Sequence, residues 1–189
     1  SQIQSISAGN NIGQKKVRLN VTRALSRLKS VFITFIKPNT FTNKYYIGRN
    51  RFNTFYSPAK VYDELVNPAE FGFEFQLQLG SKLYPEYPIT SHQEGYYHLR
   101  KAVGGQNNKY NTIGIKALQY QGAKFILGMD MERVLEAGFS GQNTRAGDIL
   151  NVNFQHNGDN SEFYAHEMQI ILHSDNIMEI RDSGITIFD

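Results

Sequence analysis

The sequence predicts an all-β fold: a jelly-roll sandwich of about eight antiparallel strands, with two short helices in the connections. Its 189 residues include 13 Phe and 11 Tyr, which favour pleated, half-buried surfaces. Short segments alternate between apolar and polar residues, and turn residues rich in Gly, Asn and Asp separate them. Many short strands spaced by turns are typical of sandwiches and jelly rolls rather than of alternating strand–helix folds.

The first segments predict an arm followed by two strands. Residues 1–14 are polar and rich in Gly and Asn, so we expect a flexible arm or linker ahead of a single jelly-roll domain over residues 15–189. Residues 15–21 (KKVRLNV) alternate as a half-buried strand does. Residues 30–37 (SVFITFIK) are rich in β-branched and aromatic residues, which indicates a buried strand.

A long irregular segment precedes the clearest strand of the chain. Residues 38–70 mix turn residues with aromatics, and we expect a long loop with a short strand inside it. In residues 71–79 (FGFEFQLQL) every odd position is apolar, so this strand should bury one face in the core. Pro85 and Pro88 follow, and because proline cannot donate a ladder hydrogen bond, we expect them to end the strand region.

Residues 92–103 carry the strongest helix signal. Ser91 and Glu94 have the spacing of a capping box, in which the Ser hydroxyl accepts a hydrogen bond from a free backbone N–H of the first turn and the Glu carboxylate accepts one from the backbone N–H of the N-cap residue. Arg100 and Lys101 lie in the last turn, where the helix dipole favours cations. Two glycines follow and predict the end of the helix.

The second half of the chain predicts short strands and one more helix. Residues 112–120 and 123–129 should be strands, and residues 130–138 should be a short helix with Asp130 at its N-cap. Four further strands are expected at regular spacing over 148–154, 166–174, 176–181 and 184–188.

Charge is distributed unevenly along the chain. The formal net charge is only +3, yet residues 1–60 contain 11 Lys and Arg and no Asp or Glu, and residues 61–189 contain nine Lys and Arg and 17 Asp and Glu. One interpretation is that the two parts pair within one chain or between copies. The other is that the basic part faces nucleic acid, because phosphate neutralisation dominates such binding.

The candidate interface residues follow from this asymmetry. Basic side chains alternate with aromatic ones between residues 44 and 56, where the aromatic rings could stack on bases or anchor a subunit contact. The candidates for a subunit interface or a nucleic-acid-facing surface are Lys15, Lys16, Arg18, Arg23, Arg27, Lys29, Lys44, Arg49, Arg51, Tyr45, Tyr46, Phe52 and Phe55.

No constellation of residues indicates catalysis. The sequence has no nucleophile elbow, phosphate-binding glycine loop, zinc-protease motif or calcium loop. It has no Cys, and its five His do not share the spacing of a metal site. We therefore expect a protein that is not an enzyme, with no cofactor, no metal and no catalytic residue.

The order of four segments resembles a known family. The segments are RALSRLKSVFITFIKP, LGSKLYPEYPITSHQEGYYHLRKAVG, KFILGMDMERVLEAGFSGQNTRAGDILNVNF and MQIILHSDNIMEIRDSGITIFD. Over roughly residues 15–189 they resemble the C-terminal part of double-jelly-roll, hexon-like major capsid proteins of Polinton/Maverick-type elements, adintovirus-like viruses and virophages. A double jelly roll needs about twice this length, so the chain would correspond to one half of it.

The resemblance implies a structural virion protein located in the capsid. Such a protein builds an icosahedral shell around double-stranded DNA from trimeric capsomers. The implied partners are other copies of the chain, other capsid proteins, an upstream jelly roll as a separate or cleaved chain, and genomic DNA through the basic first third. The alternative function is a nucleic-acid-binding or carbohydrate-binding β-sandwich module. A third hypothesis is a metal-dependent enzyme on a jelly roll, which would need a cluster of His and Glu side chains to hold the metal.

Overall fold

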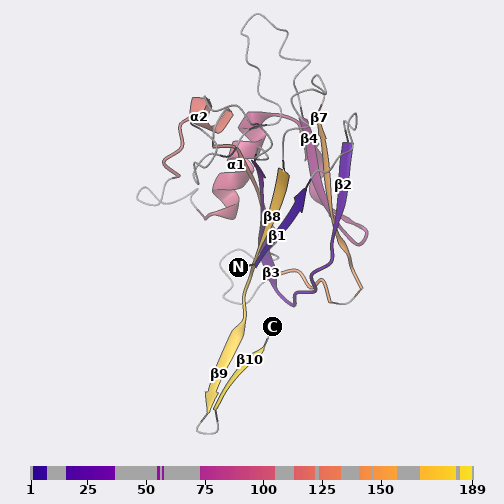
Figure 1. Cartoon of the computed structure of the whole chain (residues 1–189), viewed down its shortest axis with the longest axis vertical. Coiled ribbons are helices and arrows are strands. Elements are labelled where there is room, and N and C mark those ends of the chain that lie inside the picture. Colours follow the sequence, from indigo (N-terminus) through magenta and orange to yellow (C-terminus); the bar gives the residue numbers. More distant parts are fainter. Residues whose placement is uncertain are drawn as a thin grey trace, which may run out of the picture.

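The computed structural model describes residues 2–7, 16–36, 55, 57, 73–104, 113–121, 124–132, 141–145, 147–156, 167–181 and 184–188. These residues form ten strands and two helices (Figure 1). The strands are β1 (Gln2–Ser7), β2 (Lys16–Val21), β3 (Leu28–Ile36), β4 (Phe73–Leu79), β5 (Lys82–Ile89), β6 (Ile126–Asp130), β7 (Leu150–His156), β8 (Glu167–Ser174), β9 (Ile177–Arg181) and β10 (Gly184–Phe188). The helices are α1 (His92–Ala102) and α2 (Ala117–Gln121).

Eight of these strands form a jelly roll. The first four-stranded sheet has the order β1-β8-β3-β6, and the second has the order β2-β7-β4-β5. The antiparallel pairs are nested along the chain, because β1 pairs with β8, β2 with β7, β3 with β6 and β4 with β5. Two facing sheets with this nested pairing are the jelly-roll arrangement, so the fold class expected from the sequence is confirmed.

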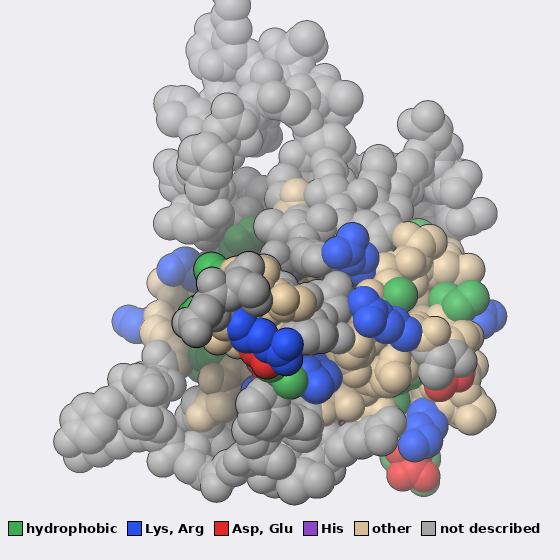
Figure 2. All heavy atoms as spheres, turned by 90° about the horizontal axis from the view of Figure 1, so that it is seen from below, with side chains coloured by type: hydrophobic (Ala, Val, Ile, Leu, Met, Phe, Trp, Pro, Cys, Tyr) green, Lys and Arg blue, Asp and Glu red, His purple; other side chains and the backbone are tan. Residues whose placement is uncertain are grey.

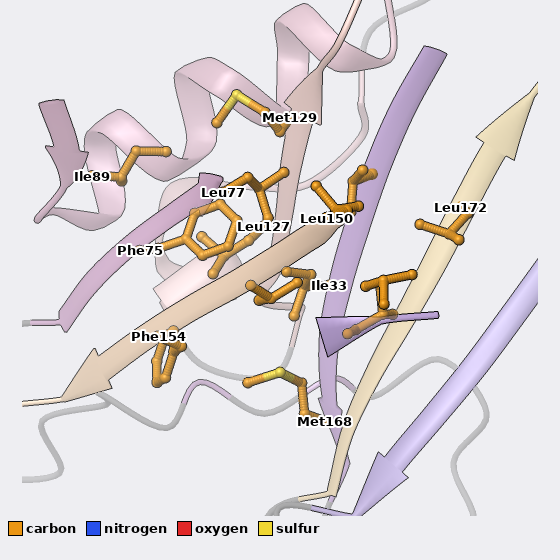
Figure 3. Close-up of a cluster of buried hydrophobic side chains, with 14 of the residues drawn as sticks. Ile33, Phe75, Leu77, Ile89, Leu127, Met129, Leu150, Phe154, Met168 and Leu172 are labelled. Atoms are coloured by element: carbon orange, nitrogen blue, oxygen red, sulfur yellow. The ribbon is translucent and has the colours of Figure 1, made fainter. Parts of the chain in front are cut away.

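The core lies between the two sheets and is apolar. Alternation along β4 buries Phe73, Phe75, Leu77 and Leu79, each at most 4% exposed, as the sequence predicts. The register places Phe75 beside Phe154 and Leu77 beside Val152 of β7. Figure 3 shows side chains of both sheets meeting in this layer. The labelled residues from one sheet are Ile33, Leu127, Met129, Met168 and Leu172, and those from the other are Phe75, Leu77, Ile89, Leu150 and Phe154.

Helix α1 lies against β6, the edge strand of the first sheet, and begins where the sequence predicts. Ser91 is its N-cap and accepts a hydrogen bond from the Glu94 backbone N–H. The Glu94 carboxylate in turn accepts from the Thr90 backbone N–H at 2.9 Å. A helix over an edge strand shields that strand from pairing with another chain.

The expectation that the two prolines end the strand region is wrong, because strand β5 runs through both of them. Pro85 and Pro88 both lie inside β5. This is possible because β5 is the outer strand of its sheet. A proline on an edge strand can turn its missing donor away from the neighbouring strand, so little ladder pairing is lost.

Two further expectations are wrong. Residues 2–7, expected in a flexible arm, form strand β1 at the edge of the first sheet, because β8 supplies hydrogen-bonding partners that local composition does not reveal. Residues 117–120, expected at the end of a strand over 112–120, lie instead in helix α2, in which Tyr120 is buried and donates a hydrogen bond to the Ile126 carbonyl at 2.9 Å.

Two expected elements lie largely outside the described residues. They are the loop over 38–70 and the helix over 130–138. Of the loop, Phe55 and Ser57 are described, and Phe55 forms a parallel bridge with Lys124. Of the helix, residues 130–132 are described; Asp130 ends β6 and accepts a hydrogen bond from the Glu132 N–H at 3.0 Å.

Strands β9 and β10 form a separate two-stranded sheet. Figure 1 shows this hairpin projecting from one end of the sandwich. The sequence predicts both strands but places them in the sandwich. The hairpin is thus an addition to the eight-stranded body.

Candidate interaction surfaces

The outer face of the second sheet carries a regular array of polar side chains, here called the polar face. Nine residues from β2, β7 and β4 form three cross-strand rows. The rows are Lys16–Gln155–Glu74, Arg18–Asn153–Gln76 and Asn20–Asn151–Gln78. Residues between them along each strand point into the core, because side chains of a strand alternate between its two faces.

Hydrogen bonds hold part of the polar face in place. Arg18 Nη2 lies 3.4 Å from Gln78 Oε1, joining β2 to β4 across β7. Gln76 Nε2 donates to the backbone carbonyls of Pro85 and Glu86 at 3.0 and 3.1 Å, joining β4 to β5. These bonds fix the amide orientations and leave the charged groups of β2 exposed.

Two open hollows on this face share Arg18. One is lined by Arg18, Leu19, Asn20, Ile149 and Asn151, and the other is lined by Lys16, Arg18, Glu74, Phe75, Gln76, Pro88, Asn153, Phe154 and Gln155. Sites that enclose a small molecule are concave and mostly apolar. A broad polar face of this kind suits contact with another macromolecular surface.

The basic candidates from the first third fall into different environments. Lys16 and Arg18 are exposed on the polar face, and Arg23 is exposed in the connection to β3. Arg27 is partly buried in the same connection. The segment over 141–145 pairs with this connection, since Leu28 and Gln142 exchange backbone hydrogen bonds of 2.8 and 2.9 Å.

Lys29 is engaged within the chain. Its Nζ lies 3.0 Å from Glu132 Oε1 and 3.1 Å from Asp175 Oδ2. Hydrogen bonds to these two carboxylates raise the pKa of Lys29. This pairing joins the basic first third to the acidic remainder of the same chain, and it takes Lys29 away from a phosphate-binding role.

The aromatic candidates are mostly outside the described residues. Phe55 is half-buried, and its carbonyl accepts a hydrogen bond from the Phe125 N–H at 2.9 Å. It therefore helps join a loop to the sandwich. The candidates outside the described residues are Lys15, Lys44, Tyr45, Tyr46, Arg49, Arg51 and Phe52.

Figure 2 views the end of the molecule from which the hairpin projects. Lys and Arg side chains occur at several separate places across this end, and a few Asp and Glu side chains lie among them. On this end of the molecule, the Lys and Arg side chains of the described residues are therefore dispersed rather than gathered into one continuous stripe.

In the part of the chain that the structure describes, packed apolar side chains fill the space between the two sheets. The inward side chains of β3, β4, β6 and β7 are apolar and almost completely buried. Within the same residues, no three His, Cys, Asp or Glu side chains come together as a metal ion would require. A jelly-roll enzyme with its site between the sheets would need polar side chains at these inward positions.

His92 is the described histidine most enclosed by aromatic rings. Its ring lies edge-on to Phe73 and Phe125, with centroids 5.3 and 5.4 Å apart, and its Nε2 lies 3.1 Å from Ser57 Oγ. Burial lowers the pKa of His92, because the charged imidazolium would lose its hydration.

This environment predicts a pH-dependent stability. Below about pH 6.5 the unfolded chain takes up a proton at His92 more readily than the folded chain. The free energy of unfolding should therefore fall as the pH drops below that value. The His92→Gln variant should show a shallower fall in urea titrations between pH 7.5 and 5. An equal pH slope in the variant and the wild type would contradict this placement of His92.

One surface was missed by the sequence reasoning: the apolar side of the β9–β10 hairpin. Met178, Ile180 and Ile185 are 58%, 70% and 65% exposed. The alternation of both strands and the turn between them were visible in the sequence. That pattern predicts an apolar face, and it does not tell whether the same chain covers that face.

A scan against protein-family models and a search of curated proteins each find no match. Within the described residues, no helix is both long enough and apolar enough to cross a membrane. The assignment of function therefore depends on the fold, its surfaces and the resemblance in segment order.

Proposed function

We propose that this protein is a structural building block of an icosahedral capsid, forming trimeric capsomers of a shell around double-stranded DNA. The observation that carries the proposal is a jelly roll whose interior is filled by apolar side chains and whose candidate interaction features lie on its outer surface. These features are the polar face and the projecting apolar hairpin. Jelly rolls serve as capsid, lectin and cupin domains, and only a site or surface can decide among these uses.

The apolar interior favours a structural role over a cupin-like one. Both sheets turn large apolar side chains inward, so that Phe35 of β3 meets Phe154 of β7 with ring centroids 4.9 Å apart. A body packed in this way is a rigid unit for assembly. The order of segments that resembles hexon-like capsid proteins supports the same function.

The outer surfaces suit contacts with other proteins. Three strands present amides and both signs of charge in fixed rows, and polar groups at fixed spacing give an interface specificity and register. The partners we propose are other copies of the chain, other capsid proteins and an upstream jelly roll. The protein would then be located in the virion.

A binding module for nucleic acid or carbohydrate is the alternative. The exposed basic residues of β2 favour nucleic acid, and the pairing of Lys29 with two carboxylates weakens that case. Binding through phosphates would lose affinity steeply as salt rises, because bound counterions are released. A measurable affinity for DNA in filter binding that falls steeply between 50 and 200 mM salt, without assembly of the protein, would favour the module.

Assembly is the direct test of the proposed function. The chain, purified alone and together with a partner jelly-roll domain, should form trimers in native mass spectrometry and sedimentation velocity. The trimer should persist on dilution, because obligate interfaces often bury over ~2,000 Å². A monomer at every concentration with both preparations would overturn the proposal.

A further inference from the structure

We propose that the polar face of the second sheet is a two-fold contact surface, on which the same face of a second copy packs. This inference rests on the proposed function, because it takes the partner to be another copy of the chain. It adds which surface makes the contact and how the two copies are oriented. Neither described helix covers this face: α1 lies against β6 of the first sheet, and Figure 1 shows both helices away from β2 and β7.

The two sides of the polar face have opposite chemistry. Strand β2, on one side of β7, presents the exposed donors Lys16 and Arg18. Strand β4, on the other side, presents the exposed acceptor Glu74 in the row of Lys16 and the amide of Gln76 in the row of Arg18. Gln76 donates its Nε2 hydrogens to two backbone carbonyls of β5, so its Oε1 is the atom that can accept from a second copy. Donors therefore line one side of the face, and acceptors line the other.

One orientation of a second copy matches these donors to these acceptors. A two-fold axis parallel to β7 places β2 of each copy over β4 of the other and keeps every row in line. Lys16 then lies over the second copy's Glu74, and Arg18 lies over the second copy's Gln76, on both sides of the axis. The three amide side chains of β7 meet their own counterparts, and an amide both donates and accepts. The polar face is therefore complementary to itself in this orientation.

The other face-to-face orientation with two-fold symmetry is unfavourable. An axis across the strands would place β2 over β2 and reverse the order of the rows. Arg18, in the middle row, would then face the second copy's Arg18, and Lys16 would face Asn20. Like charges opposite each other at an interface oppose binding. The charge pattern therefore selects the axis parallel to β7.

An exposed apolar side chain lies on the line of this axis. Ile149 directly precedes β7, is 55% exposed and lines one of the two hollows together with Arg18 and Asn151. Because Ile149 continues the line of β7, the axis brings it close to the second copy's Ile149. Their contact would bury apolar surface that water covers in the single chain, which favours association.

A nucleic-acid backbone fits the polar face less well than a second copy does. Phosphates would pair with Lys16 and Arg18, but the carboxylate of Glu74 in the row of Lys16 would repel them. A second copy supplies a cation for this carboxylate and a carboxylate for Lys16. The arrangement of both signs of charge in one row thus favours the chain's own copy as the partner.

The size of the face sets the strength and the place of the contact. Its nine side chains on each copy are fewer than the roughly 20–30 residues a side of a standard stable interface. We therefore expect weak association of the free chain and a stronger contact where other contacts raise the effective concentration of the copies. A surface that binds itself makes a two-fold contact, so it would link neighbouring capsomers and leave the trimer to other surfaces.

Exchanging charges between the two sides of the face tests the contact. Lys16→Glu and Glu74→Lys each place like charges opposite each other, so each variant alone should self-associate roughly tenfold more weakly than the wild type. An equimolar mixture of the two variants restores opposite charges at both positions and should regain the wild-type affinity as a heterodimer. Sedimentation equilibrium measures the affinities, and native mass spectrometry with one variant isotope-labelled separates heterodimers from homodimers.

Two controls accompany the charge exchange. Lys116→Glu makes the same charge change just before α2, away from the polar face, and should leave self-association unchanged. On the wild-type chain, which needs no substitution, a zero-length carbodiimide should join Lys16 of one copy to Glu74 of an isotope-labelled copy. No such cross-link at a chain concentration of about 1 mM would overturn the inference. A mixture of folded variants that associates no better than each variant alone would overturn it too.

Three outcomes separate this contact from the proposed function. Trimers without recovery on mixing would leave the proposed function standing and end the inference. Recovery on mixing without trimers would support the contact and end the capsid proposal. Duplex DNA that binds Glu74→Lys more tightly than the wild type and fails to bind Lys16→Glu, with no association between copies, would assign the polar face to nucleic acid and overturn the inference.

Discussion

Replacing Phe154 by alanine should lower the free energy of unfolding by about 3–5 kcal/mol. Phe154 is 1% exposed on β7, and its ring lies 4.9 Å from that of Phe35 on the facing sheet and 6.0 Å from that of Phe73 on β4. Truncation removes both contacts and leaves a cavity that the two rigid sheets cannot close. Urea unfolding followed by circular dichroism measures the loss.

A matched control separates this effect from a general effect of losing an aromatic ring. Tyr97 lies on the outer side of α1 and is 57% exposed. Tyr97→Ala should change the stability by no more than about 0.5 kcal/mol. Similar losses for Phe154→Ala and Tyr97→Ala would contradict the position of Phe154 at the centre of the sandwich.

Replacing Gly128 by valine should cost about 1–3 kcal/mol by overpacking. Gly128 lies on β6 where helix α1 approaches the sheet edge. A Cβ atom at this position would lie 3.0 Å from Leu99 Cδ1, 3.1 Å from Leu99 Cα and 3.2 Å from Phe32 Cδ1. The side chains could shift, but the Leu99 Cα belongs to the helix backbone, so α1 as a whole would have to move.

Gly114 provides the control for this second prediction. Among the described residues, no atom lies within 4 Å of a Cβ built on Gly114. Gly114→Val should therefore change the stability by no more than about 0.5 kcal/mol. Thermal unfolding of both variants decides the matter, and a Gly128→Val protein as stable as the wild type would show that α1 does not approach β6 so closely.

The fold could be predicted from local patterns wherever burial itself is periodic. Strand β4 shows this best, because its alternation reports directly which side faces the core. Strand β5 could not be predicted, because a proline is tolerated only when the strand is at an edge, and edge position is a property of the whole topology. The same holds for β1, whose hydrogen bonds are supplied by β8 at the other end of the sandwich.

The candidate surfaces could be predicted only in part. Alternation in residues 15–21 places Lys16 and Arg18 on one side of a strand, and the structure puts them on the polar face. The strand register, which the sequence does not reveal, brings the partner amides of β7 and β4 beside them. Lys29 was expected at an interface, and its two carboxylate partners come from distant parts of the chain.

Electron microscopy of the material assembled by the chain together with the proposed upstream jelly-roll domain tests the central claim most directly. We predict closed shells tiled by trimeric units of pseudo-hexagonal outline, with the jelly-roll sandwich described above fitting the density of each unit. Images showing only isolated monomers, or shells from which this chain is absent, would contradict the assignment of the protein as a capsid building block.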